Sequence, residues 1–400
     1  MGKTKISDYS DLKTPCFLFD ETEFQRGIRE FQAALKSRSF DYIIGYSVKT
    51  CSLPYALRKA RDFGCMAEVV SRDEYQLATL CGFNPQKIIY NGPMKSYETF
   101  IEAVSQGAIV NIETKRELKW LDELPDGQVY KIGLRLNINI SHVSPEDADG
   151  DDDNSRFGFS DETDEFCDAV KLISSNPKVH LAGLHIHRTT HSRSPRFYER
   201  SIEYAAQVIK KYDLKLDYLD VGGGYFGIFH NKPTFRDYAE AFNQALHRNG
   251  LDQLQIIIEP GNALTASSFK FLSEVIDVKR VDSKTRFVTT DGSRNDIDPF
   301  FRKTNYLKEI LYKEGNRPIE PFQVIGGCSC LEYDRLFTLV DSPLINIGDR
   351  ILYNNVGAYT LTLSPLFIRL WPRVYSISRE RDKKVVRREL NASDIINFDS

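Results

Sequence analysis

Residues 254–261 read Leu254-Gln255-Ile256-Ile257-Ile258-Glu259-Pro260-Gly261, a short apolar run that ends in a glutamate and a turn. A nearly continuous apolar run of this length is typical of a strand buried on both faces of a parallel sheet. Seven earlier runs have the same character, at 42–48, 66–70, 87–91, 108–112, 130–136, 179–186 and 216–221. The run at 254–259 is therefore the last of eight expected strands.

Helical patterns separate these strands. Apolar residues recur three and four positions apart in the segments 53–63, 72–81, 97–106, 115–124, 161–174, 195–212 and 234–249. Eight strands that alternate with helices predict a (β/α)₈ TIM barrel of the α/β class. An open doubly wound sheet is the alternative, but residues 45–50, after the first strand, lack the G-x-G-x-x-G spacing of that fold.

The pattern changes after about residue 265. Strand-like segments separated by turns follow at 269–281, 286–290, 322–326, 350–354 and 368–378. They predict an additional, mostly antiparallel β-domain, and the strand-like segment 14–19 is expected to pair with it. We therefore expect a barrel over residues 36–270 and a β-domain that combines residues 1–35 with residues 271–400.

Composition narrows the class of protein. The 400 residues include 53 basic and 56 acidic side chains, a formal net charge of −3, with 41% hydrophobic and 27% charged residues. These values are ordinary for a soluble globular protein and give no basic excess for nucleic acid or an anionic membrane. Apolar runs are too short to cross a bilayer. Seven sparse cysteines argue against a disulfide framework, so we expect a reducing, cytoplasmic location.

Chemically active residues follow several expected strands, where TIM barrels carry their active sites. Lys49 ends the first strand and is placed either to be solvated or to form a Schiff base. His185 and His187 share one side of the sixth strand, for packing or metal binding. The glycines 222–224 form a flexible turn or a phosphate cradle. Glu259 ends the eighth strand and needs a cationic partner if it is buried.

These groups together match the needs of one cofactor. Pyridoxal 5′-phosphate takes a lysine amine, a phosphate site and a carboxylate that keeps its pyridine nitrogen protonated. An amine, an imidazole, a glycine turn and a carboxylate occur in this order at the ends of strands one, six, seven and eight. The order favours a pyridoxal-phosphate enzyme, and we expect no metal.

Over residues 14–361 the chain resembles the fold-type III pyridoxal-phosphate decarboxylases, which include diaminopimelate, ornithine, arginine and carboxynorspermidine decarboxylases. Their Y-x-x-K motif is matched by residues 46–49, so the resemblance makes Lys49 the Schiff-base lysine. Their G-x-H-x-H strand is matched by residues 183–187, which implies that His187 stacks on the pyridine ring. Their E-P-G motif is matched by residues 259–261, which implies that Glu259 pairs with the pyridinium nitrogen.

The resemblance implies an alanine racemase-like barrel plus β-domain and an amino-acid carboxy-lyase in amino-acid metabolism. Further cofactor-binding residues implied by it are Thr190, Gly222, Gly223, Gly224, Gly261 and Tyr359. Glu68 and Glu74 fall on family positions near the cofactor pocket, and Arg135 matches the fifth-strand arginine. Residues 155–158 resemble the family's S-K-F-G segment with Arg156 in place of lysine.

The β-domain carries the family's G-P-x-C-x-x-x-D segment at residues 327–334. Aligning its last residue on Asp334 places the catalytic cysteine at Cys330, the expected proton donor, with Cys328 at the usual proline position. In this family the cysteine enters the active site of the partner subunit, which implies a homodimer with shared active sites. Packing or an adventitious metal are the other interpretations of the Cys-x-Cys pair.

Departures from the family pattern concern the substrate. Asn262 follows E-P-G, where the family commonly has an arginine that helps diaminopimelate decarboxylases grip the distal end of the substrate. Leu331 replaces an acidic residue after the cysteine, and Arg188, His191 and Arg193 add positive charge. We therefore expect an amino-acid-like small molecule, free, conjugated or carrier-bound, rather than ordinary meso-diaminopimelate. The expected substrate-binding residues are Arg156, Asp296, Arg302 and Asp334.

Two questions stay open in the sequence. The acidic segment 146–153 lacks the spacing of a calcium loop and is either a solvated loop or a lid that attracts a cationic substrate. An amino-acid racemase or a non-catalytic pyridoxal-phosphate-binding protein is the alternative function. The cysteine segment argues against a racemase, which has a tyrosine there, and the β-domain argues against the single-barrel binding proteins.

Overall fold

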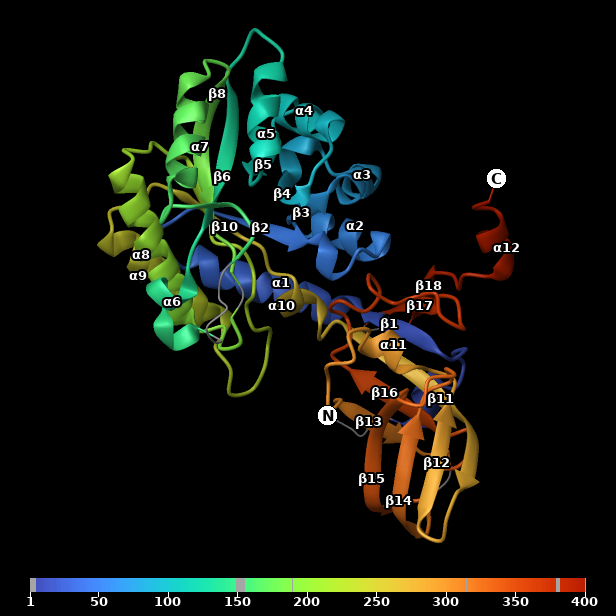
Figure 1. Ribbon diagram of the computed structural model, residues 1–400. Helices are drawn as coiled ribbons and strands as arrows, with labels where there is room; N and C mark the ends of the chain where they lie inside the picture. Colours follow the sequence, from blue (N-terminus) through green and yellow to red (C-terminus); the bar gives the residue numbers. More distant parts are fainter. Residues whose placement is uncertain (1–4, 149–154, 189, 314, 379–381, 400) are drawn as a thin grey trace. The chain divides into compact units, whose positions relative to one another are not determined.

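The computed structural model describes residues 5–148, 155–188, 190–313, 315–378 and 382–399 (Figure 1). The chain forms two compact units, one over Arg26–Leu264 and one that joins Met1–Gln25 to Thr265–Ser400. The first boundary falls inside helix α1 (Glu21–Lys36), an element that the sequence patterns did not predict. The division at 25/26 and 264/265 thus lies before the expected positions at 35/36 and 270/271.

Eight parallel strands close into a barrel in the first unit. Each begins within two residues of its predicted start, and the set comprises β2 (Tyr42–Ser47), β3 (Met66–Ser71), β4 (Ile88–Met94), β5 (Ile109–Ile112), β6 (Tyr130–Asn137), β8 (Val179–His185), β9 (Tyr218–Asp220) and β10 (Gln255–Ile258). Pairing of β5 with β6 and of β10 with β2 closes the ring. A short extra strand, β7 (Phe159–Ser160), pairs with β6.

Helices follow the strands on the outside of the barrel, as the alternating pattern predicts (Figure 1). They are α2 (Pro54–Asp62), α3 (Arg72–Leu80), α4 (Tyr97–Ser105), α5 (Lys115–Trp120), α6 (Ile140–Val143), α7 (Asp164–Ser175), α8 (Pro195–Lys211), α9 (Phe235–Arg248) and α10 (Asn262–Thr265). Several begin at a serine or threonine whose hydroxyl accepts from the first turn, such as Ser71, Ser96 and Ser194. Such caps satisfy backbone N–H groups that have no helical partner.

The barrel interior changes from apolar to polar along the strands. Met66, Ile89, Tyr218 and Ile257 belong to one buried cluster. Two residues further along the same four strands come Glu68, Asn91, Asp220 and Glu259, all buried. Because side chains two apart on a strand share a face, these polar groups point into the barrel as well. The strands therefore deliver a polar set to their carboxyl ends on an apolar base.

The second unit is a mostly antiparallel sheet. Its strands are β1 (Cys16–Asp20), β11 (Phe269–Arg280), β12 (Thr285–Thr290), β13 (Lys308–Leu311), β14 (Ile319–Gly326), β15 (Arg335–Pro343), β16 (Arg350–Asn354), β17 (Arg373–Ile377) and β18 (Lys383–Arg387). Strand β1 pairs with β11 and β17, so the N-terminal segment belongs to this sheet as expected. Strands β13, β15 and β18 were not predicted. Two short helices complete the unit, α11 (Arg294–Ile297) and α12 (Ala392–Ile396).

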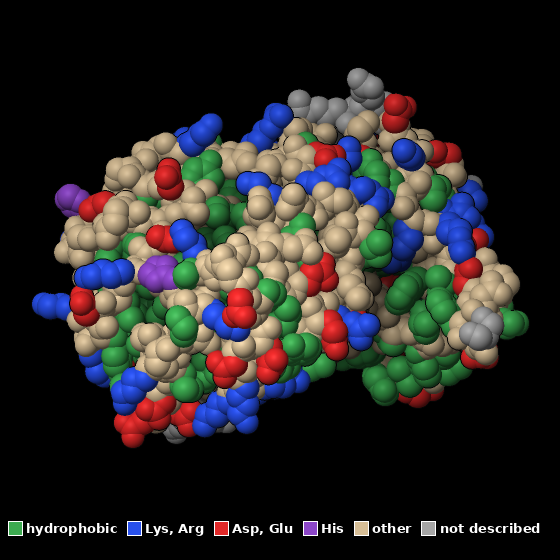
Figure 2. All heavy atoms as spheres, turned by 90° about the horizontal axis from the view of Figure 1, so that it is seen from above, with side chains coloured by type: hydrophobic (Ala, Val, Ile, Leu, Met, Phe, Trp, Pro, Cys, Tyr) green, Lys and Arg blue, Asp and Glu red, His purple; other side chains and the backbone are tan. Residues whose placement is uncertain are grey.

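Charged side chains of both signs are interspersed over the face of the molecule seen in Figure 2. This mixture agrees with the small net charge of −3. Within the described residues, no helix combines the length and the apolar character needed to cross a membrane.

Candidate active site

Lys49 lies in a 3₁₀ turn directly after β2, at the carboxyl end of the barrel. Its Nζ is 2.6 Å from Oε2 of Glu68, which also accepts a hydrogen bond of 2.6 Å from the Ser47 hydroxyl. The Glu68 side chain is 1% exposed, whereas that of Lys49 is 31% exposed. A buried carboxylate therefore orients an amine that remains reachable.

Glu259 lies immediately after β10 and is buried. Its Oε1 accepts a hydrogen bond from Nδ2 of Asn91, and its Oε2 is 3.7 Å from Nε2 of His185. The same Asn91 Nδ2 also lies 3.3 Å from Oε1 of Glu68. One amide therefore joins the carboxylate beside Lys49 to the carboxylate that ends the eighth barrel strand.

Asp220, the last residue of β9, lies beside Glu259. Its Oδ1 accepts a 2.9 Å hydrogen bond from the Gly222 amide, and a carboxylate oxygen of each acid and a nitrogen of His185 lie within 4.8 Å of one another. Burial, reinforced by the charge of Glu259, raises the pKa of Asp220 well above its usual range. Burial therefore favours the protonated form of Asp220 beside the Glu259 carboxylate.

The glycine turn after β9 is closely packed from two sides. A Cβ atom on Gly222 would lie 2.4 Å from Nδ1 of His187, and one on Gly223 would lie 2.3 Å from the Glu259 carbonyl oxygen. The Gly222 and Gly223 amides already donate to Asp220 and His187. Among the described residues, no hydrogen-bond acceptor is found for the Gly224 amide. This amide is therefore the one in the glycine turn that can donate to a bound anion.

His187 is held by its neighbours in a defined protonation state. Its Nδ1 accepts a 3.0 Å hydrogen bond from the Gly223 amide, which places the ring proton on Nε2. Burial lowers the pKa of His187 to about 3. Its carbonyl oxygen accepts from Arg135, whose guanidinium also pairs with Glu113 at 2.8 Å. The result is a neutral, fixed imidazole at the barrel mouth.

These residues fit pyridoxal 5′-phosphate. Lys49 supplies the amine, His187 a flat neutral ring, Glu259 a buried anion and Gly224 an available amide. Buried polar atoms without hydrogen bonds in the described structure include Oγ1 of Thr50 and both ring nitrogens of His185, which a polar ligand would satisfy. A Cβ on Gly261 would lie 2.1 Å from that Thr50 oxygen, which explains the glycine there.

Other predicted cofactor residues make local contacts. The Thr190 hydroxyl lies 3.1 Å from that of Ser192 and accepts from the Arg193 amide at 3.0 Å, so it organises the turn after β8. Glu74 accepts from the Val70 amide at 2.9 Å, and burial raises its pKa to about 7. Their roles toward a cofactor stay predictions.

Asp147 was not singled out by the sequence, which treats 146–153 as a solvated loop or a lid. Residues 149–153 lie outside the described ranges, but Asp147 is buried. Its carboxylate accepts from the hydroxyls of Ser144 at 2.7 Å and Ser194 at 2.9 Å, and from Ser192. A solvated loop is therefore wrong for this residue, which ties the acidic segment to the turn after β8.

In the β-domain, Asp334 organises the cysteine segment. Its Oδ2 accepts from the hydroxyls of Ser293 at 2.9 Å and Ser329 at 2.6 Å, and its Oδ1 accepts from the Arg294 amide at 2.8 Å. Cys330, four residues before Asp334 in the sequence, is exposed, and Cys328 is half-buried. Burial raises the pKa of Cys328.

The remaining predicted residues differ in exposure. Asp296 is buried and pairs with Arg369, whereas the Arg302 guanidinium lies 5.2 Å from the Phe300 ring. Tyr359 is 39% exposed and has a φ of +57°, a strained value for a tyrosine. The Arg156 guanidinium lies 4.5 Å from the Phe157 ring in the barrel unit. Whether they bind substrate or cofactor stays a prediction.

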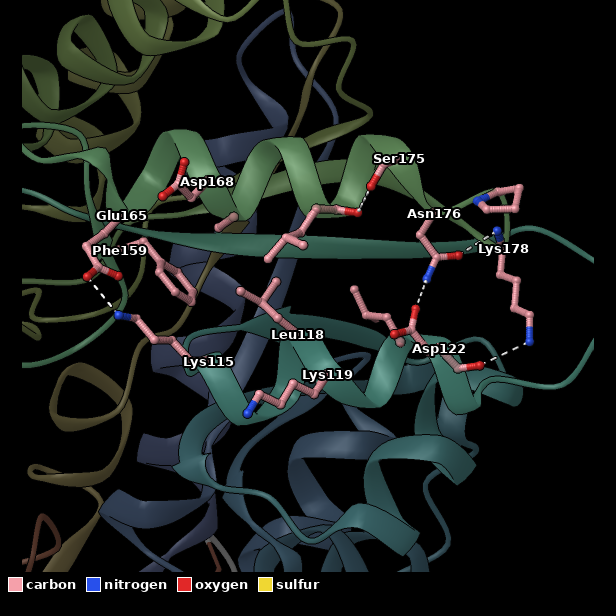
Figure 3. Close-up of a pocket in the computed structure, with 14 residues that line it drawn as sticks. Lys115, Leu118, Lys119, Asp122, Phe159, Glu165, Asp168, Ser175, Asn176 and Lys178 are labelled. Carbon is pink, nitrogen blue, oxygen red and sulfur yellow. Dashed lines mark hydrogen bonds and ion pairs between the residues drawn. The ribbon is translucent and has the colours of Figure 1, made fainter.

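A separate groove of about 660 Å³ lies on the outer wall of the barrel between α5 and α7 (Figure 3). Leu118 and Phe159 project into it, and a 2.8 Å ion pair between Lys115 and Glu165 closes one end. None of the strand-end residues described above lines it.

Comparisons with known proteins agree with this geometry. Residues 21–266 match the family model described as "Pyridoxal-dependent decarboxylase, pyridoxal binding domain". The chain is 27% identical to the probable chloroplastic diaminopimelate decarboxylase of Oryza sativa subsp. japonica, over 96% of this chain and 79% of the rice protein. It is 26% identical to the diaminopimelate decarboxylase of Helicobacter pylori strain J99, over 97% of this chain and 96% of that protein.

Solved structures give the same fold. Diaminopimelate decarboxylase from M. jannaschii superposes with a TM-score of 0.86 at 22% identity, covering 99% of this chain and 94% of that one. The Helicobacter pylori enzyme, complexed with L-lysine, superposes with a TM-score of 0.82 at 24% identity and 98% coverage of both chains. The barrel with a mostly antiparallel β-domain is thereby confirmed.

Proposed function

The chain belongs to the pyridoxal-dependent decarboxylase family, and we propose that its substrate differs from diaminopimelate at the end distant from the reacting carboxylate. The protein is a pyridoxal 5′-phosphate-dependent amino-acid decarboxylase, as the sequence predicts. The comparisons give no support to the alternatives of a racemase or a non-catalytic binding protein.

The roles of individual residues follow from their positions. Lys49 would hold the cofactor covalently through Nζ, with Glu259 toward the ring nitrogen and His187 against the ring face. When bound, pyridoxal 5′-phosphate supplies the electron sink that makes loss of the α-carboxylate possible. Glu68 orients the lysine amine, and the Gly224 amide would donate to the phosphate.

Cys330 is the proposed proton donor to the carbon that loses the carboxylate. A thiol that is protonated at neutral pH can give up a proton from Sγ and recover it from water. Asp334 supports this assignment, because its hydrogen bonds to Ser329 and the Arg294 amide fix the segment that carries the cysteine. Conversion of Cys330→Ala should lower kcat while leaving cofactor binding intact.

A neutral residue at position 262 carries the substrate proposal. Asn262 begins α10 directly after Gly261, where diaminopimelate decarboxylases commonly have an arginine. Positive charge is present elsewhere: the Arg193 guanidinium and the Lys232 amine lie 5.1 and 4.9 Å from the Phe226 ring. We therefore infer an amino-acid-derived substrate, conjugated or carrier-bound, whose distal group is not a free α-amino acid.

Release of carbon dioxide from a substrate panel tests this proposal. The panel holds meso-diaminopimelate, lysine, ornithine, arginine and N-acylated forms of each diamino acid. We expect the highest kcat/KM for a compound other than free diaminopimelate, and turnover of diaminopimelate alone would refute the proposal. The Asn262→Arg variant should shift the preference toward diaminopimelate by about tenfold if a bidentate carboxylate contact returns.

We also propose a cytoplasmic homodimer with two shared active sites. Mixing Lys49→Ala with Cys330→Ala protein tests the sharing, because only a mixed dimer can assemble one site from two unaltered halves. Half of randomly mixed dimers are hybrid and each has one intact site, so activity should return to about a quarter of the wild-type value. No recovery, with exchange of subunits shown by a tag, would place both residues in one protomer.

A further inference from the structure

A line of buried hydrogen bonds crosses the barrel interior and ends on the two carboxylates of the site. The Tyr218 hydroxyl on β9 donates to Oδ1 of Asn111 on β5 at 2.8 Å. Nδ2 of Asn111 donates to Oδ1 of Asn91 on β4, also at 2.8 Å. Nδ2 of Asn91 then donates to Glu259 and Glu68. We call Tyr218, Asn111 and Asn91 the barrel relay.

The direction of the barrel relay follows from chemistry. An ionised carboxylate only accepts hydrogen bonds, so Asn91 must turn its NH₂ group toward Glu68 and Glu259. Its carbonyl oxygen is then free to accept from Asn111, whose own carbonyl accepts from Tyr218. The Asn91 NH₂ group has two hydrogens, so it can donate one hydrogen bond to each of the two carboxylates.

Two neighbouring strands leave room for the barrel relay. A Cβ on Gly133 of β6 would lie 1.9 Å from Oδ1 of Asn111 and 2.2 Å from the Tyr218 hydroxyl oxygen. A Cβ on Gly183 of β8 would lie 2.1 Å from the Tyr218 ring. Both positions tolerate only glycine while the relay is in place, so the barrel is shaped around these hydrogen bonds.

We propose that Asn91 is a positioning residue that keeps Glu68 and Glu259 ionised together in one buried pocket. Both carboxylates contact the same amide nitrogen, and each negative charge in such a buried pocket raises the free energy of the other. Lys49 offsets the charge of Glu68. For Glu259, Asn91 supplies the short donor, and a hydrogen bond to the charged form stabilises it.

Other titratable groups surround the pair, and among them Asp220 can offer Glu259 a further donor only in its protonated form. They are Lys49, Glu74, Glu113, Arg135, His185, His187 and Asp220. His185 is 3.7 Å from Glu259, and burial lowers its pKa well below the usual range, so it is neutral. The inference rests on the cofactor dependence of the family and is independent of the distal substrate group proposed above.

The test compares Asn91→Ala and Asn91→Asp with a matched control. Asn176→Ala is that control, because Nδ2 of Asn176 also donates to a carboxylate, that of Asp122 at 3.0 Å, on the outer wall of the barrel. Two quantities are measured across the pH range in which the protein stays folded. They are the dissociation constant of the cofactor-free protein for pyridoxal 5′-phosphate and the visible absorbance of the bound cofactor.

For Asn91→Ala we expect the pH midpoint of the change in cofactor absorbance to lie about one unit above that of the wild type. Its affinity for the cofactor at neutral pH should be about tenfold weaker than that of the wild type. At alkaline pH the Asn91→Asp variant should bind pyridoxal 5′-phosphate as weakly as Asn91→Ala does. Toward acid pH it should recover at least about fivefold relative to Asn91→Ala, because a protonated carboxyl donates one hydrogen bond. Asn176→Ala should follow the wild-type curves.

A residue that only fills space would weaken the protein equally at every pH. Identical pH profiles for Asn91→Ala, Asn91→Asp and the wild type would therefore overturn the proposal. If Asn91→Ala does not fold, the test is whether Asn91→Asp approaches the wild-type affinity for the cofactor as the pH falls from the alkaline to the acid side, and no such gain also overturns the proposal. Neither measurement uses a substrate, so failure of the substrate panel leaves this result standing.

Discussion

The backbone amide of Gly223 donates a hydrogen bond to Nδ1 of His187 across 3.0 Å. This contact links the glycine turn after β9 to the histidine after β8, two features that the sequence places 36 residues apart. It requires Nδ1 to be unprotonated, in agreement with the pKa of about 3 that burial gives this ring. The His187 ring of the folded protein is therefore neutral at neutral pH and does not act as a cation.

This protonation state predicts a loss of stability in acid. The unfolded chain takes up a proton on His187 below its ordinary pKa of about 6.5, whereas the folded chain does so only near 3. The contribution of the neutral His187 ring to the free energy of unfolding is fully present above pH 6.5. It falls by about 1.4 kcal/mol per pH unit as the pH decreases toward 3. In the His187→Gln variant the free energy of unfolding should fall less steeply in this window.

Urea unfolding of the cofactor-free protein at a series of pH values measures this difference. The exposed His247 provides the control, because His247→Gln removes an imidazole ring outside the core. Parallel curves for the wild type and His187→Gln would mean that the folded state accepts a proton on this ring as readily as the unfolded chain does.

Asp220 predicts the opposite dependence on pH. Burial and Glu259 raise its pKa well above its usual range, so the folded chain retains a proton that the unfolded chain releases above about pH 4. The free energy of unfolding therefore falls as the pH rises through this window. Asp220→Asn carries no such proton, and its stability relative to the wild type should increase with pH by about 1.4 kcal/mol per unit. Asp168→Asn, at an exposed position, should show no such trend.

Much of this architecture could be predicted because its signals are local in sequence. The eight barrel strands are continuous apolar runs, and Lys49, His187 and Glu259 stand out where those runs end. Strand β15 escaped prediction because its apolar residues, Leu336, Phe337, Leu339 and Val340, form neither a continuous run nor a strict alternation with polar residues. Helix α1 was missed although its start is marked by Asp20, whose carboxylate accepts from the Glu23 amide.

The polar interior was beyond local prediction. Asn91 and Asn111 look like ordinary strand residues, and their partners lie on strands that are distant in sequence. Asp220 stands beside a glycine run that draws attention to phosphate binding, yet two of those amides hold Asp220 and His187 instead. Asp147 lies in an acidic run, where a buried carboxylate is unexpected until the three serines around it are brought together by the fold.

Two ion pairs near α5 should differ greatly in their effect on stability. Lys95 and Glu117 are 3.3 Å apart and wholly buried, and Glu117 also accepts from the Glu113 amide. Lys95→Met leaves this carboxylate uncompensated and should cost about 3–5 kcal/mol of unfolding free energy. Lys95→Met combined with Glu117→Gln should recover most of that loss, because neither side chain of the pair then carries a charge.

Lys115 and Glu165 provide the matched comparison. They are closer, at 2.8 Å, but the lysine side chain is 71% exposed, so water screens the pair. Lys115→Met should change the unfolding free energy by less than about 1 kcal/mol in the same urea titration. Equal losses for Lys95→Met and Lys115→Met would show that burial does not set the strength of these pairs.

The seven cysteines should react with an alkylating reagent in an order set by their exposure. Cys330 is exposed, Cys328 and Cys167 are partly buried, and the remaining four are buried. Burial raises the pKa of Cys16 and Cys65 to about 12, so their thiols stay protonated and unreactive at neutral pH. Mass spectrometry of briefly alkylated holoenzyme should therefore find the label on Cys330 first, with loss of activity in proportion to it. The residual activity of Cys330→Ser protein should not fall further on alkylation. Inactivation that instead follows the labelling of Cys167 would contradict the assignment of Cys330 as the proton donor.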